Sequence, residues 1–321
     1  MRRSLMATNI EKSQLTPQKV ASRLWSQIWK YRALYLISVP GIIYFLVFRY
    51  VPLLGSVIAF QKYNVFKGFL GSPWVGFDNF VKMFKYHDFT RILTNNLLLA
   101  LYDIVFVFPA AIILALLLNE LRIVLYKRIV QTVIYMPHFL SWVVISGIAV
   151  SVFSPVSGLF NNFIGKLGFD PLYILGENSY IRTFLVGTGM WRDVGYSTII
   201  YLAALSGISP DLYEASEIDG ANRWKQTFTI TIPALMPTIV ILFLLQIGHF
   251  LDFGFERVWV FLNSLNSENG EILDTFIYRV GILDMQYSYT TAIGLFKSVI
   301  GLTLLWIGNT LSKKTTGESL F

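Results

Sequence analysis

The stretch Ser209-Pro-Asp-Leu-Tyr-Glu-Ala-Ser-Glu-Ile-Asp-Gly220 is a polar island between two apolar runs, and Ile230-Thr-Ile-Pro233 leads into the second run. Ser209 is a suitable N-cap, and Pro210 suits the first helical position after it. Gly220 stands where the C-terminus of a helix needs a left-handed residue. Three small side chains would let another protein approach closely: Ala215, Ser216 and Ala221. The pattern predicts two short helices separated by a glycine break, in a segment that another protein can push.

The composition is typical of a membrane protein. Of the 321 residues, 55% are hydrophobic and only 14% are charged, and the mean hydropathy is +0.57. Soluble proteins usually carry about 25% charged residues, so the apolar surplus is expected to face lipid or to lie inside spans. The sequence contains no cysteine, which excludes disulfides and thiolate metal sites.

Six apolar runs are long enough to cross a membrane, which takes about 20 residues. They are residues 34–60, 92–118, 129–153, 184–208, 233–256 and 290–311. Because the first run contains Pro40 and Arg49, its outer half is expected to be broken or to lie in the membrane interface. The predicted fold is an all-α membrane protein with about six transmembrane helices, whose transmembrane domain spans 34–311 and contains a loop at 209–233.

The distribution of Lys and Arg predicts the orientation of these spans. With a cytoplasmic N-terminus, the inner segments contain 14 of the 26 Lys and Arg residues, whereas the longer outer segments contain nine. Because Lys and Arg favour cytoplasmic loops, the segments 1–33, 119–128, 209–232 and 312–321 are expected to be cytoplasmic. Trp25 and Trp29, flanked by basic residues, further predict a helix over 17–32 that lies in the membrane interface. Five basic residues in the first outer loop run against the rule: Lys62, Lys67, Lys82, Lys85 and Arg91.

No pattern for catalysis or cofactor binding occurs in the sequence. The phosphate-binding pattern GxxxxGK[ST] is absent, as are GxSxG and GxGxxG. His87, His138 and His249 are far apart and form no metal-ligand spacing. We expect no catalytic residue, metal or cofactor in this chain, so energy for uphill transport would come from another polypeptide.

Polar residues inside the fifth run are candidates for a translocation path. Ionisable groups within spans are costly and usually face a cavity or a partner. Gln246, His249 and Asp252 lie in this run, with Phe250 and Phe253 between them. If the helix continues through the run, Gln246, His249 and Phe253 share one face.

The fourth run adds Trp191, Arg192 and Asp193. Neighbouring residues on a helix point about 100° apart, so a mutual ion pair between Arg192 and Asp193 is expected to be poor. Amide, imidazole and aromatic groups suit a sugar, because hydroxyls form hydrogen bonds and pyranose C–H faces stack on rings. The alternative is that these polar groups only hold the spans together through interhelical hydrogen bonds.

Five residues of the polar island and its continuation match a known motif. Glu214, Ala215, Gly220, Ile230 and Pro233 have the spacing of Glu-Ala-Ala-x3-Gly-x9-Ile-x-Leu-Pro, with Ser in place of the second Ala and Ile in place of Leu. The chain therefore resembles permease subunits of binding-protein-dependent ABC importers, whose coupling loop carries this motif. The resemblance implies a coupling helix that docks in a groove of an ATPase subunit. The coupling residues carried over are Glu214, Ala215, Ser216, Asp219, Gly220 and Asn222.

Other segments resemble the polysaccharide and oligosaccharide branch of these importers. They begin at Pro40, Ile58, Trp74, Pro137, Ile200, Tyr278 and Ala292 and extend over nearly the whole chain. Within this branch the chain is most similar to permeases of alginate importers, so a uronate-containing cargo is one possibility. The resemblance implies alternating access across the bacterial inner membrane. It also implies four kinds of partner: a second homologous permease, two ATPase subunits that use ATP and Mg, a periplasmic solute-binding protein and the saccharide itself; no nucleic acid is expected.

Three other functions remain open at this point. A proton-coupled secondary transporter would use intramembrane Asp and His as a relay and would work without ATPase partners. A polytopic membrane enzyme would need clustered acid and base residues at one membrane level. An ABC importer permease for a solute that is not a sugar is the third, because the coupling motif carries no information about cargo.

Overall fold

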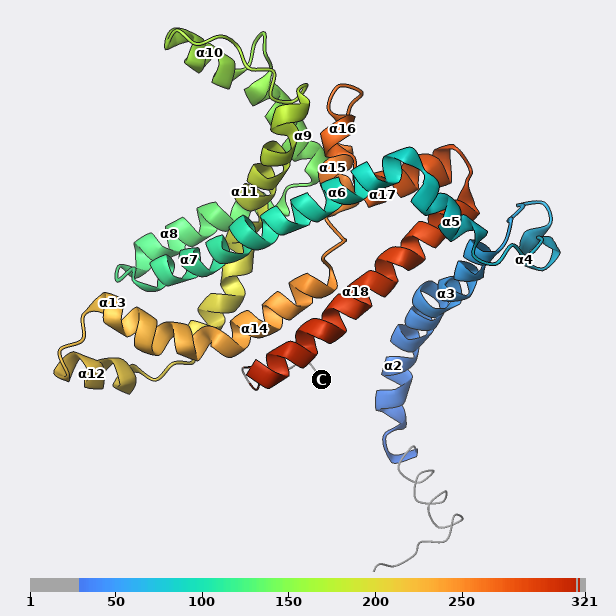
Figure 1. Ribbon diagram of the computed structural model, residues 1–321. Helices are drawn as coiled ribbons and strands as arrows, with labels where there is room; N and C mark the ends of the chain where they lie inside the picture. The colour runs from blue at the N-terminus through green and yellow to red at the C-terminus, as the bar shows by residue number, and fades with distance from the viewer. Residues whose placement is uncertain (1–28, 316, 318–321) are drawn as a thin grey trace, which may run out of the picture. The chain divides into compact units, whose positions relative to one another are not determined.

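The computed structural model describes residues 29–315 and 317, and the chain divides into two compact units, 1–57 and 58–321. Within the described residues the regular structure is helical, apart from one isolated bridge between Gln61 and Trp74 (Figure 1). The all-α prediction is therefore confirmed. The predicted interfacial helix at 17–32 lies mostly outside the described residues. The same holds for the predicted tail at 312–321, of which only 312–315 and 317 are described.

One candidate span, Arg32–Phe60, makes up most of the described part of the first unit and ends three residues inside the second unit. Its helices are α2 (Arg32–Phe45), the π-helical turn η1 (Leu46–Tyr50) and α3 (Val51–Gly55), and the span continues through the 3-10 turn η2 (Ser56–Phe60). Side chains from Arg32 to Leu54 are exposed on all sides, as expected of a helix that faces lipid. The helix becomes π-helical around Arg49 but continues beyond it, and Pro40 lies inside α2 without interrupting it.

The second unit contains the remaining helices. Its first half comprises α4 (Gly68–Gly71), α5 (Asp78–Lys85), α6 (His87–Tyr102), η3 (Asp103–Val107), α7 (Phe108–Asn119), α8 (Val124–Tyr135), η4 (Met136–Phe139), α9 (Trp142–Phe153) and α10 (Leu159–Lys166). Its second half comprises α11 (Asn178–Leu205), α12 (Pro210–Ile218), α13 (Arg223–Gln226), η5 (Thr227–Thr231), α14 (Ile232–Gly248), α15 (Phe255–Trp259), α16 (Ser267–Gly270), α17 (Leu273–Phe276), η6 (Ile277–Leu283) and α18 (Tyr287–Thr315).

The six predicted spans correspond roughly to the helices observed. Four helical stretches of the described chain are long and apolar enough to cross a membrane: Arg32–Phe60, His87–Asn119, Arg223–Gly248 and Tyr287–Lys314. A fifth is the pair Val124–Phe139 and Trp142–Phe153, which is bent by 103°. The remaining predicted span, 184–208, lies in α11, which has 28 residues but carries charged side chains within its apolar run.

Two predicted spans differ from the structure. The run 129–153 is not a single straight helix, because the chain turns after Pro137 and Ser141 caps a new helix by accepting a hydrogen bond from the Val144 amide (3.3 Å). The run 233–256 is not helical to its end, because α14 stops at Gly248 and a turn follows. In both cases the apolar run continues past the end of the helix, so hydropathy does not locate that end.

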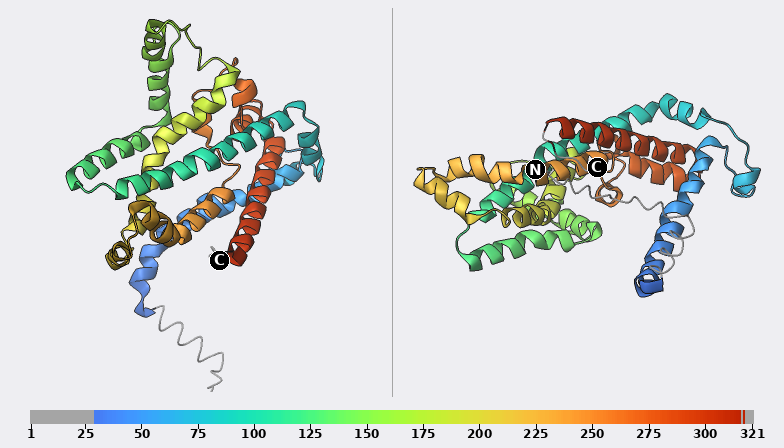
Figure 2. Two further views of the ribbon diagram at one scale, coloured as in Figure 1. Left: turned by 60° about the vertical axis from the view of Figure 1, so that its left-hand side comes forward. Right: turned by 90° about the horizontal axis from the view of Figure 1, so that it is seen from below.

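Close contacts between helices depend on small residues. The helix α11 packs on α7, where the Thr198 hydroxyl donates to the Ala111 carbonyl (3.3 Å). A Cβ at Gly195 would lie 2.1 Å from the Ile134 carbonyl oxygen, so α11 approaches α8 at backbone distance. The helices α14 and α18 run side by side (Figure 2), and a Cβ at Gly301 would lie 2.9 Å from the Gly248 carbonyl oxygen.

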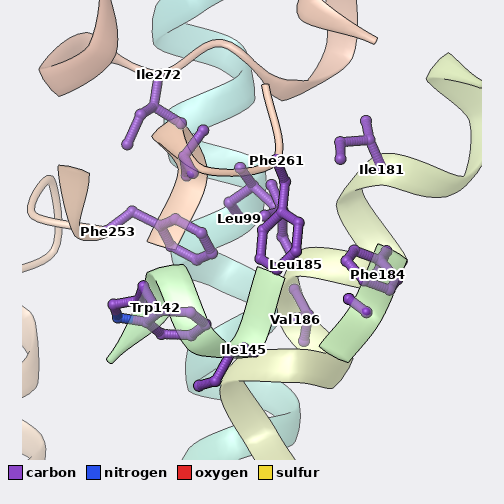
Figure 3. Close-up of a cluster of buried hydrophobic side chains, with 12 residues drawn as sticks. Leu99, Trp142, Ile145, Ile181, Phe184, Leu185, Val186, Phe253, Phe261 and Ile272 are labelled. Atoms are coloured by element: carbon purple, nitrogen blue, oxygen red, sulfur yellow. The ribbon is translucent and has the colours of Figure 1, made fainter. Parts of the chain in front are cut away.

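The largest buried cluster gathers α6, α9, α11 and the segment around α15 (Figure 3). Phe184 and Phe261 meet edge to face, with ring centroids 5.1 Å apart. Phe253 is buried in the same cluster and is 7% exposed. This cluster fixes the segment that follows α14 against α11, and the polar site described below lies on its border.

Candidate functional site

The helix α12 has the ends that the sequence predicts. The Ser209 hydroxyl accepts a hydrogen bond from the Asp211 amide (3.3 Å). Gly220 has φ of 74°; its amide donates to the Glu217 carbonyl (3.0 Å), and the Ala221 amide donates to the Ser216 carbonyl (2.9 Å). These two bonds form a Schellman motif, which ends a helix at a left-handed glycine.

The helices α12 and α13 are joined to each other and to the start of the next span. The Gln226 side chain is buried, and its amide donates to the Ser216 hydroxyl (3.0 Å). The Tyr213 hydroxyl lies 3.0 Å from the Thr231 hydroxyl at the entry to α14. The segment 209–226, hereafter the α12–α13 segment, is therefore a connected unit that is hydrogen-bonded to the start of α14.

The outward surface of the α12–α13 segment mixes polar and apolar groups. Glu214, Ala215, Asp219 and Asn222 are exposed, as a docking role requires, whereas Ser216 is half-buried. Sequence reasoning missed three exposed apolar side chains in this segment: Leu212, Ile218 and Trp224. Ile218 is 88% exposed. An isoleucine in a polar loop between two apolar runs was the available signal, because large apolar side chains on a surface often mark a protein interface.

A polar cavity of about 370 Å³, the polar pocket, lies among η3, α11, α14 and α15. Asp103 and Arg257 lie on its wall as a two-pronged ion pair, with Nη1–Oδ2 at 2.7 Å and Nη2–Oδ1 at 3.0 Å. The Arg257 guanidinium also donates to the Leu185 carbonyl and stacks on Phe253, 3.9 Å from its centroid. Side chains of both charged residues are mostly buried, so the pair satisfies two charges that would be costly alone.

The residues predicted in the fifth run do not share one helix face. Gln246 and His249 line the polar pocket at the end of α14. Phe253 does not join them, because α14 ends before it and its ring is buried in the core. Phe250 is half-buried in the turn after α14. Asp252 lies on a neighbouring cavity of about 460 Å³, which His249 also lines.

Lys297 is the central charge of that neighbouring cavity. Its ammonium lies 2.6 Å from Asp252 and also contacts the Asp274 carboxylate. The Lys297 side chain is 10% exposed, so it is held between two carboxylates instead of extending toward the membrane surface. Asp252 is therefore a charge partner of α18 as well as a cavity residue.

Arg192 and Asp193 form the ion pair that the sequence disfavours, with Nη1 and Oδ1 at 2.9 Å. The long arginine side chain bridges the angle between neighbouring positions. Each residue also has a further partner: Asp193 contacts His138 Nδ1 (2.9 Å), and Arg192 lies over the Trp142 ring. Asp193 lines the polar pocket, whereas Trp191 lines an apolar cavity of about 590 Å³ between α9 and α11.

Gly189 gives the Arg257 side chain its space, which yields a first prediction. A Cβ at Gly189 would lie 2.2 Å from Arg257 Nη2 and 2.3 Å from Cζ, and the guanidinium is held on three sides. We expect Gly189→Ala to destabilise the protein by about 1–3 kcal/mol through overpacking. Thermal unfolding of the purified protein measures this as a lower Tm.

Gly187→Ala is the matched control, because it lies in the same helix and its added Cβ has no atom within 4 Å. Alanine has the higher helix propensity, so the Tm of this control should stay the same or rise. Equal Tm values for the two variants would mean that Arg257 moves aside without cost.

The chain is similar to membrane components of transport systems. The family model for "Binding-protein-dependent transport system inner membrane component" matches residues 107–317. LplB of Bacillus subtilis is 45% identical over 288 residues, covering 90% of this chain and 91% of LplB. YteP of the same organism, a polygalacturonan/rhamnogalacturonan transport system permease protein, is 44% identical over 299 residues, covering 93% of each chain.

Solved structures agree with these relatives. A chain from a bacterial ABC transporter involved in the import of the acidic polysaccharide alginate superposes with a TM-score of 0.85 at 36% identity, covering 92% of this chain and 99% of that chain. A second chain, from an alginate ABC transporter in complex with an alginate pentasaccharide-bound periplasmic protein, gives a TM-score of 0.86 at 36% identity, covering 93% and 100%. The chain therefore belongs to the family of inner membrane components of binding-protein-dependent transport systems, as the permease subunit of an ABC importer.

Proposed function

We propose that this permease is one membrane-spanning subunit of an ATP-driven importer of poly- or oligosaccharides and that it works by alternating access. The observation that carries the proposal is the position of α14. One end of this helix is tied to the exposed α12–α13 segment through Tyr213 and Thr231, and its other end carries Gln246 and His249 on the polar pocket. A movement imposed at one end therefore reaches the cavity at the other.

The partners follow from the same arrangement and from the family. An ATPase subunit would hold the α12–α13 segment through Glu214, Ala215, Ser216, Asp219, Gly220 and Asn222, together with the exposed Ile218. That contact requires the segment and both chain termini to be cytoplasmic. A second ATPase, a second permease and a periplasmic solute-binding protein would complete the importer, with Mg and ATP bound by the ATPases.

The polar pocket supplies groups suited to a sugar. Its wall carries an amide, an imidazole, a tyrosine hydroxyl and a serine hydroxyl from Gln246, His249, Tyr201 and Ser197. His249 Nδ1 lies 3.0 Å from the Leu245 carbonyl oxygen; because a carbonyl only accepts, Nδ1 is the donor of this bond, and Nε2 is left for a bond to cargo. The names of YteP and of the two solved transporters refer to acidic polysaccharides, which makes uronate-containing chains the favoured cargo class.

Reconstitution tests this function. The four kinds of subunit in proteoliposomes should accumulate labelled oligogalacturonate or alginate oligomers when ATP is inside, and a proton gradient without ATP should drive no uptake. Uptake by this chain alone in response to a proton gradient would instead establish a secondary transporter.

His249→Ala and Gln246→Ala test the polar pocket. Each substitution removes about one hydrogen bond to cargo, and a bond of about 1.4 kcal/mol corresponds to about tenfold slower uptake at limiting cargo. Basal ATP hydrolysis should stay at the wild-type rate, because neither residue lies in the α12–α13 segment.

His87→Ala is the control for the histidine, since the His87 side chain is fully exposed at the start of α6. It should leave uptake unchanged. If His249→Ala or Gln246→Ala prevents assembly of the complex instead, these residues hold spans together and do not contact cargo.

A further inference from the structure

A second polar cavity, of about 590 Å³, lies where the loop after η2, α5, η6 and the start of α18 meet; we call it the outer pocket. Figure 1 shows α5 and the first turns of α18 together at one end of the second unit, with the α12–α13 segment at the other. The lining includes four cationic side chains and one carboxylate: Lys62, Lys82, Lys85, Arg279 and Asp284. A concave surface with this excess of positive charge attracts anions.

The lysines of the outer pocket lack internal partners. Lys82 and Lys85 are three positions apart on α5 and share a face. Within the described part of the chain, neither ammonium group forms an ion pair or a hydrogen bond, and the same is true of Lys62. Arg279 differs, because its guanidinium is paired with the Glu271 carboxylate at 2.8 Å. Three mutually repelling charges remain available for an external anion.

Tyrosines complete the outer pocket. Tyr63, Tyr86, Tyr287 and Tyr289 line it, and the Tyr63 and Tyr287 rings meet edge to face with centroids 6.3 Å apart. The Tyr289 hydroxyl is buried and makes no hydrogen bond within the described residues. Tyrosine offers an apolar ring face and a polar hydroxyl, which match the C–H face and the hydroxyls of a sugar ring. Cations and tyrosines around one cavity therefore match a sugar acid better than a lone phosphate.

The outer pocket and the Lys297 cavity are both lined by residues of α18. Lys297 lies ten residues after Tyr287 in α18, which is about 15 Å along the helix. The Lys297 cavity shares His249 with the polar pocket. Three polar cavities thus follow one another from the outer end of α18 to the end of α14.

We infer that the outer pocket is a binding site for the carboxylates of an anionic oligosaccharide, with Lys82 and Lys85 as its principal cations. This site rests on the proposed function, since it would receive cargo before the polar pocket does. Lys62 and Arg279 add positive charge at its border, and the tyrosines hold the sugar rings between the carboxylates.

The test uses the assembled importer in nanodiscs without its solute-binding protein. Binding of fluorescein-labelled trigalacturonate is measured by anisotropy at low ionic strength, with labelled maltotriose as the neutral probe. K82Q/K85Q should bind trigalacturonate about tenfold more weakly than wild type, because two exposed charge contacts are lost. Added salt should reduce this difference, since exposed charges are screened, and maltotriose binding should not change.

K67Q/K166Q is the matched control, because it removes two exposed lysines that do not line the outer pocket. It should bind trigalacturonate within twofold of wild type. Equal affinity of wild type and K82Q/K85Q, or an equal loss in the control, overturns the site. If K82Q/K85Q instead loses only the stimulation of ATPase activity by the binding protein, with trigalacturonate binding intact, the pocket docks an acidic protein surface and the inference is wrong.

Uptake by the wild-type importer separates this inference from the proposed function. Trigalacturonate binding that depends on Lys82 and Lys85, without ATP-driven uptake of any saccharide, supports the site and contradicts the proposed function. Saccharide uptake with unchanged binding by K82Q/K85Q does the reverse.

Discussion

Gly220→Pro is expected to abolish coupled transport, with ATP-driven uptake reduced at least about tenfold, while the protein still inserts into the membrane. Gly220 has φ of 74°, whereas proline is locked near −65°. Proline also lacks the amide that donates to the Glu217 carbonyl. The incompatible φ angle and the missing hydrogen bond would together destroy the turn between α12 and α13. Uptake into proteoliposomes and ATPase stimulation by the loaded binding protein measure the effect, and both should fall together.

Gly168→Pro is a control of the same chemistry. Gly168 has φ of 86°, follows α10 and donates its amide to the Gly165 carbonyl. Because it lies outside the α12–α13 segment, its replacement should leave coupling intact.

Glu214→Ala distinguishes a side-chain contact from the shape of the backbone, since the helix tolerates alanine and only the exposed carboxylate is lost. Wild-type uptake by Gly220→Pro would contradict the proposal that the ATPase acts on this permease through the α12–α13 segment.

The ends of α12 could be predicted because their causes are local. Ser209, Pro210 and Gly220 act through neighbours within a few residues, and the structure reproduces the expected cap and glycine break. The apolar runs could also be predicted as spans, since each contains enough hydrophobic residues to cross a membrane. The coupling role of Glu214 and its neighbours remains a prediction, because it depends on a protein outside this chain.

Helix ends inside apolar runs could not be predicted from hydropathy. The run through Leu251 stays apolar although α14 ends at Gly248, so the expected shared face of Gln246, His249 and Phe253 does not form. The bend between α8 and α9 is similar, because Pro137 permits it but the packing of α11 against both sides fixes its angle. Local residues allow these breaks, and tertiary contacts decide them.

The pairing of charged residues that are distant in sequence also could not be predicted. Asp103 stands 154 residues from Arg257, and Lys297 lies far from Asp252 in the chain. Each charge was visible in the sequence as an anomaly within or beside an apolar run. The pairing itself required the fold, because a single sequence carries no signal that joins two distant positions.

The Asp103–Arg257 pair gives the largest expected effect on stability. Asp103→Leu or Arg257→Met alone leaves one mostly buried charge without its partner, which costs about 3–5 kcal/mol. The double variant replaces both charges by apolar groups, so it should recover more than half of that loss. Unfolding of the purified complex by heat or denaturant measures the three variants against wild type, and their coupling energy follows from the double-mutant cycle.

Glu120→Gln provides the matched control, because Glu120 pairs with Arg223 at 3.4 Å where both side chains are about half exposed. Losing this exposed pair should cost less than about 1 kcal/mol. If Asp103→Leu costs no more than Glu120→Gln, the Asp103–Arg257 pair is solvated and does not hold α15 against η3 and α11. If the double variant is stable but takes up no cargo, the pair is needed on the wall of the polar pocket itself. Stability and uptake measured on the same variants therefore separate the pair's contribution to the fold from its contribution to transport.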